Sequence, residues 1–71
     1  MAEEIKTPLA GKVISVLVNK GDTVEEDDEI VVLEAMKMET SVYSTADGKV
    51  SEIRVKPGDS VEEDDVLMVL Q

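Results

Sequence analysis

An internal duplication is the feature that most constrains the fold of this 71-residue chain. Residues 11–34 and 48–71 align without a gap at a constant offset of 37 residues, and about half of the paired positions are identical. A solenoid array needs about three or more stacked repeats, so two copies exclude that architecture. The duplication therefore predicts one small domain, residues 1–71, with pseudo-twofold symmetry, in which each half covers the apolar face of the other.

Each half reads as short strands separated by turns. Valine-rich extended runs at 13–18 and 50–55 lack clean alternation, which indicates a β-bulge or burial on both faces. Pro57 followed by Gly58 fits a type II turn, with positive φ at the glycine, and Gly21 holds the equivalent position in the first half. These patterns predict an all-β sandwich or flattened barrel.

Two further local signals concern the ends of these strands. Apolar runs at 30–33 and 66–70 predict a buried strand closing each half. Asp47-Gly48 predicts a hairpin that joins the region of Val42 to the strand containing Val50. A helix is hard to place: 25–28 could form a single turn, but Asp is a weak helix former and no apolar stripe with helical spacing surrounds it.

Composition excludes several functions. The chain has no histidine and no cysteine, which removes the commonest general base, the commonest metal ligand and any thiolate nucleophile. A net charge of −10 disfavours nucleic acid as a partner. No apolar run could cross a bilayer, and the acidic start does not resemble a secretory signal, so we expect a cytoplasmic protein without membrane insertion.

The acidic runs at 25–28 and 62–65 invite a calcium-site interpretation. Calcium loops space their oxygen ligands and need a glycine at the bend, whereas adjacent carboxylates in a short turn do not converge on one ion. We therefore expect no metal site. The runs are predicted to form a solvated acidic edge that could meet basic partner surfaces.

The segment after Glu34 has no counterpart in the second copy, which stops at Gln71. Strand patterns on both sides make 35–38 a hairpin turn, and the symmetry places this tip opposite both chain ends. Lys37, in the turn, is the only basic residue between Lys20 and Lys49. Turns favour Gly, Asn, Asp and Ser, so two methionines around a turn lysine break the local rule, as functional sites often do.

Residues 34–40, Glu-Ala-Met-Lys-Met-Glu-Thr, resemble the biotin attachment motif of biotinyl domains, whose signature is Ala-Met-Lys-Met. Residues 8–13 resemble the opening strand of that family, and 20–24 and 57–61 resemble its paired turns. The resemblance implies a barrel-sandwich hybrid: a flattened barrel of two four-stranded antiparallel sheets, with the biotinyl lysine on a hairpin tip. The uninterrupted repeat leaves no room for the inserted thumb loop of some members.

The resemblance also implies a role for each residue of the motif. Lys37 would carry biotin covalently, and Met36 and Met38 would be recognition residues for biotin protein ligase. The other positions that match the motif or flank it are Ala35, Glu34 and Glu39.

By the same resemblance, the chain would be a biotin carboxyl carrier and not an enzyme itself. Biotin on Lys37 would shuttle a carboxyl group from a biotin carboxylase to a carboxyltransferase, or take part in the reaction of a decarboxylase, all on other domains or subunits. Two alternatives remain. A lipoyl carrier shares this fold, although its tip usually reads Asp-Lys-Ala, and an unmodified adaptor module would have no use for Lys37.

Overall fold

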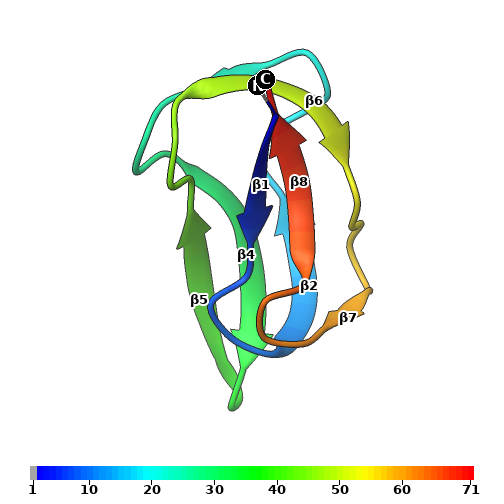
Figure 1. The fold of residues 1–71 in the computed structure, drawn as a ribbon. Helices are drawn as coiled ribbons and strands as arrows, with labels where there is room; N and C mark the ends of the chain where they lie inside the picture. Colours follow the sequence, from blue (N-terminus) through cyan, green and yellow to red (C-terminus); the bar gives the residue numbers. More distant parts are fainter. Residues whose placement is uncertain (1) are drawn as a thin grey trace.

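The computed structural model describes residues 2–71, which form two antiparallel sheets packed face to face (Figure 1). One sheet has the strand order β1-β8-β6-β3 and the other β5-β4-β2-β7. The eight strands are β1 (Glu3–Lys6), β2 (Gly11–Val16), β3 (Thr23–Val24), β4 (Glu29–Ala35), β5 (Met38–Tyr43), β6 (Gly48–Ile53), β7 (Ser60–Val61) and β8 (Val66–Leu70). The fold class expected from the sequence is confirmed. Nothing in the described chain is a helix long and apolar enough to span a membrane.

The two sheets are related by the sequence repeat. Adding 37 to the residue number carries β2 onto β6, β3 onto β7, β4 onto β8 and β1 onto the second part of β5. The same operation converts the strand order of the first sheet into that of the second. The predicted pseudo-twofold symmetry is therefore confirmed, and each position in one half has an internal counterpart for comparison.

The core lies between the sheets and is aliphatic. Its buried members come in repeat-related pairs such as Val13 with Val50, Val24 with Val61, and Leu33 with Leu70. Full burial of one such side chain contributes about 1.5–3 kcal/mol. Because both halves supply the same positions, neither sheet can bury its inner face without the other.

A β-bulge in each half explains the irregular alternation in the sequence. Between β2 and β4 the register steps from Val13 to Ser15, so Ile14 is the extra residue. Between β6 and β8 it steps from Val50 to Glu52, which leaves Ser51 extra. The expected irregularity is thus a bulge, and it turns two successive side chains away from the core.

The glycine turns also follow the prediction. Gly21 and Gly58 both have a φ of 97°. In each turn a backbone N–H donates back across three residues, from Asp22 to Asn19 and from Asp59 to the carbonyl of the residue before Pro57. Positive φ without strain is the reason for glycine here.

The hairpin predicted at Asp47-Gly48 is wrong. Strands β5 and β6, on either side of it, lie in different sheets, so this segment crosses between layers. Neither residue has a positive φ. A Cβ built on Gly48 would lie 3.0 Å from the carbonyl oxygen of Gln71 and 3.1 Å from the Cβ of Leu70. Position 48 therefore requires glycine because of this close approach, and not because of a turn.

The acidic runs are exposed, as expected, and one carboxylate in each run also forms a hydrogen bond that stabilises the local turn. The carboxylates of Asp28 and Asp65 accept hydrogen bonds from the backbone N–H groups of Glu25 and Glu62, at 2.9 and 2.8 Å. The preceding residue of each run, Asp27 or Asp64, has a positive φ, which Asp tolerates better than most residues. Across residues 2–71 no group of three or more acidic side chains is arranged to hold a metal ion.

The molecule is elongated, with extents of 34 × 17 × 17 Å. The N- and C-terminal ends lie together at one end of the long axis, and the turn between β4 and β5 projects from the other (Figure 1). This confirms the placement of the tip opposite both chain ends.

Candidate attachment site

The candidate site is the hairpin between β4 and β5. Ala35 pairs with Met38 as the last residues of the two strands, which leaves Met36 and Lys37 as a two-residue loop. The expected turn at 35–38 is confirmed, with its outer residues belonging to the strands.

The backbone of this loop is strained. Met36 has a φ of 54° and Lys37 a φ of 64°. Positive φ at both central residues defines a type I′ turn, for which Asn-Gly is the usual sequence. A residue other than glycine in this region costs about 1–3 kcal/mol. The chain accepts that cost twice in succession to place a methionine and a lysine at its tip.

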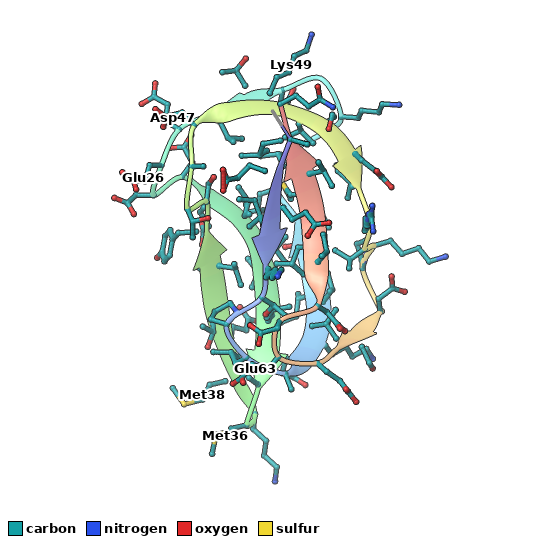
Figure 2. All side chains as sticks on the ribbon, viewed as in Figure 1. Glu26, Met36, Met38, Asp47, Lys49 and Glu63 are labelled. Carbon is teal, nitrogen blue, oxygen red and sulfur yellow. The ribbon has the colours of Figure 1, made fainter. Side chains whose placement is uncertain are left out.

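The side chains at the tip are turned to solvent. Met36 is 94% exposed and Met38 69% exposed, and Figure 2 shows both at the hairpin end of the molecule. Methionines usually fill gaps in a core, but these two fill none. They present apolar, adaptable surface on both sides of Lys37, which suits contact with a partner.

Lys37 is exposed and has no ion-pair partner. Within residues 2–71 the one salt bridge joins Arg54 to Glu52, far from Lys37 in the sequence. Among the described residues the ε-amine therefore makes no salt bridge that would have to break before it is acylated.

Glu34 and Glu39 lie directly opposite each other on β4 and β5, one pair before Ala35 and Met38. Both are exposed. Opposed residues of antiparallel strands have Cβ atoms about 4.5–5.5 Å apart, so like charges there repel. Lys12 of β2 flanks Glu34 on its other side and supplies one positive charge to the row.

The sequence reasoning missed a supporting residue, Gly11. A Cβ on Gly11 would lie 2.6 Å from the carbonyl oxygen of Glu34 and 3.5 Å from the Cβ of Ala35. Gly11 thus lets β2 approach the end of β4 just before the turn. The glycine shared by the two repeat copies, at 11 and 48, was the available signal.

Comparison with known proteins agrees with this geometry. The family model described as "Biotin-requiring enzyme" matches residues 3–70. Over 37 residues the chain is 60% identical to the methylmalonyl-CoA carboxyltransferase 1.3S subunit of Propionibacterium freudenreichii subsp. shermanii, covering 52% of this chain and 30% of the relative. Over 42 residues it is 43% identical to biotinylated protein TB7.3 of Mycobacterium tuberculosis, covering 59% of each. The biotin carboxyl carrier protein of Streptococcus mutans is 46% identical over 41 residues, 58% of this chain and 32% of the relative.

Solved structures show the same fold. The urea carboxylase of Kluyveromyces lactis matches with a TM-score of 0.92 and 37% identity, covering 100% of this chain and 6% of that one. A single-chain, multi-domain long-chain acyl-CoA carboxylase matches with a TM-score of 0.88 and 31% identity, covering 96% and 7%.

The chain therefore belongs to the family of biotin-requiring enzymes, as a biotinyl carrier domain and not a catalytic one. The names of its relatives support a biotin carrier over a lipoyl carrier. The chain spans between about a third and three-fifths of the length of these three relatives.

Proposed function

We propose that residues 1–71 form one biotinyl domain whose Lys37 carries biotin through an amide bond and so serves carboxyl transfer. One observation carries the proposal: Lys37, which has no salt-bridge partner within residues 2–71, lies in a strained two-residue turn and has an exposed methionine on each side of it in the sequence. A turn selected for stability alone would hold Asn-Gly. The residues present fit covalent attachment, since the tip offers an exposed amine with adaptable apolar surface on both sides of it.

Bond formation consumes the amine. The nitrogen of Lys37 attacks the activated carboxyl carbon of biotin, a new C–N bond forms, the activating group leaves with its electron pair, and the amine loses a proton. The ligase supplies the activation at the expense of ATP. As in lysine acetylation, the positive charge disappears, so the modified domain gains one net negative charge.

Once attached, biotin supplies a ureido nitrogen that can accept and release a carboxyl group. The domain's part is geometric. Lys37 and the biotin side chain together extend about 13 Å from the backbone. The paired strands β4 and β5 fix the origin of this arm, while tethering raises its local concentration at a partner's site to about millimolar for short flexible links.

The partners we propose are a biotin protein ligase, a biotin carboxylase, and a carboxyltransferase or decarboxylase subunit. We propose the cytoplasm as the location of all of them, since ATP is available there. Relatives named as subunits of a carboxyltransferase and of two decarboxylases, and structural neighbours that are carboxylases, support the carboxylase, carboxyltransferase and decarboxylase partners.

The test is the intact mass after co-expression with an active biotin ligase and free biotin. We expect a gain of one biotin minus one water. Lys37→Arg keeps the charge and should abolish the gain, whereas Lys20→Arg, in another exposed turn, should leave it intact. A lipoyl-sized gain, or none in the wild-type chain, would contradict the proposal and favour a lipoyl carrier or an adaptor.

A further inference from the structure

The pseudo-twofold symmetry shows that the two outer faces of the molecule differ. Ile14, Leu17 and Tyr43 are 37%, 48% and 54% exposed. Their repeat counterparts on the opposite sheet are Ser51, Arg54 and Lys6, all polar. Apart from the tip methionines, these three are the large hydrophobic side chains that the described part of the chain leaves exposed. Single exposed apolar residues are ordinary, but confinement to one of two equivalent faces is not.

The three side chains are neighbours on the outer surface of the sheet β5-β4-β2-β7. Alternate residues of these strands, Val16 and Val42, pack into or against the core. The N–H of Leu17 donates to the carbonyl of Ile30, and the adjacent residue of β4, Glu29, pairs with Tyr43. Leu17 and Tyr43 thus lie on either side of β4 at the same level of the sheet.

Ile14 is the bulged residue one step nearer the hairpin, beside the pair formed by Ser15 and Val32. Val32 is half-buried and lies between β2 and β5. We call Ile14, Leu17, Val32 and Tyr43 the apolar face. Val32 and Tyr43 belong to β4 and β5, the two strands that the hairpin with Lys37 joins, whereas Ile14 and Leu17 lie on and just after the neighbouring strand β2 (Figure 1).

Charge also distinguishes the two outer faces. Glu29 lies within the apolar face, on β4 between Leu17 and Tyr43, where its carboxylate accepts a hydrogen bond from Ser41. Towards the hairpin the same outer surface carries two more exposed carboxylates, Glu34 and Glu39, and one lysine, Lys12. The other sheet carries Lys6, Lys49 and Arg54 against Glu4 and Glu52. The first face is apolar and acidic, and the second is weakly basic and polar. A complementary partner surface is apolar and basic.

The reach of the reacting group indicates which partner needs this face. Unmodified lysine extends about 6 Å from its backbone, whereas the biotinylated arm extends about 13 Å. An enzyme that acts on the bare amine must therefore approach the protein scaffold closely, while one that acts on the arm can stay farther away.

Resting on the proposed function, we propose that the apolar face docks the enzyme that attaches biotin to Lys37. That enzyme would bind through an apolar patch that also carries basic residues, and this contact would hold the hairpin at its active site.

The symmetry supplies a matched test. The docking variant Ile14→Ser/Leu17→Arg/Tyr43→Lys receives the residues that the fold already accepts at the equivalent positions. The control variant Ser51→Ile/Arg54→Leu/Lys6→Tyr makes the reverse exchange on the other face. A neutral variant, Ile14→Ser/Leu17→Gln/Tyr43→Gln, removes apolar contact without adding charge. Biotinylation kinetics with purified ligase then give KM and kcat for each carrier, after thermal unfolding has confirmed that it folds.

We expect KM to rise at least about tenfold in the docking and neutral variants, with kcat within about twofold of wild type, because loss of a contact centre weakens binding and leaves the chemistry intact. The control variant should keep the wild-type KM. Unchanged KM in the neutral variant, or an equal rise in the control, overturns the inference.

Two other outcomes have separate meanings. A wild-type chain that forms dimers, which the neutral variant abolishes without changing KM, assigns the face to a second copy and overturns the inference. A wild-type chain that the ligase never modifies overturns the proposed function itself. Failure of docking and failure of attachment are therefore distinguishable.

Discussion

Gly11 lies so close to Glu34 that a Cβ on the glycine would be 2.6 Å from the carbonyl oxygen of the glutamate. Through this contact β2 packs against the end of β4. Glu34 lies three positions before Lys37 in the sequence. Because Gly11 has no positive φ, close approach and not backbone freedom requires glycine here.

Gly11→Ala should displace the end of β4 and destabilise the domain by about 1–3 kcal/mol, the usual cost of an overpacked contact. The equivalent change, Gly48→Ala, meets its nearest atom at 3.0 Å and should cost less. Urea unfolding measures both free energies. Equal costs, or a more stable Gly11→Ala, would show that the carbonyl moves aside freely.

The tip is predicted to trade stability for function. Lys37→Gly removes the penalty of a positive φ and should stabilise the domain by about 1 kcal/mol, while it abolishes modification. Met36→Asn should stabilise similarly and keep the lysine. Lys20→Gly is the control: its φ is not positive, so it should lose stability. A destabilised Lys37→Gly in thermal unfolding would refute the strain argument.

Because Glu34 and Glu39 lie opposite each other, removing one of the two charges should raise the stability of the domain by an amount that depends on salt. Glu39→Gln should raise stability by about 0.2–1 kcal/mol at low ionic strength, because it removes like-charge repulsion across the strands. The gain should shrink in 1 M salt, where screening acts over about 3 Å. Glu63→Gln, in an exposed loop at a position with no opposed carboxylate in a strand pair, is the control. A gain that is equally large at high salt would point to a cause other than charge.

The repeat was sufficient to predict two equivalent halves, because a gap-free duplication requires the same strands and turns in each. The strand and turn patterns predicted the all-β class, and the two four-stranded sheets were expected from the resemblance to biotinyl domains. The repeat also located the tip, since residues 35–40 have no partner in the second copy. The hairpin predicted at Asp47-Gly48 was wrong because the glycine is required there by a close tertiary contact with Gln71, and not by a turn. Gly11 was missed for the same reason: its repetition at position 48 marks the residue, but the sequence does not show which distant segment it contacts.

The division of the outer surface into an apolar and a polar face required the structure as well. Ile14 lies beside strands that carry Tyr43 only after β2, β4 and β5 assemble. In the sequence, Ile14 and Leu17 read as ordinary strand residues. Ile14 faces outward as the neighbour of buried Val13, and Leu17 faces outward because the bulge reverses the alternation that follows.

The acidic runs yield the last prediction, because two of their carboxylates act as turn caps. Asp28→Ala and Asp65→Ala each remove a hydrogen bond to a backbone N–H and should cost about 1 kcal/mol. By symmetry the two costs should be similar and, as the sites are far apart, roughly additive in the double variant. Glu26→Ala and Glu63→Ala are the controls, since within residues 2–71 neither side chain makes a hydrogen bond, and Figure 2 places them towards opposite ends of the molecule. Chemical denaturation distinguishes the two pairs. If all four variants lose the same stability, the runs contribute only net charge and the capping assignment fails.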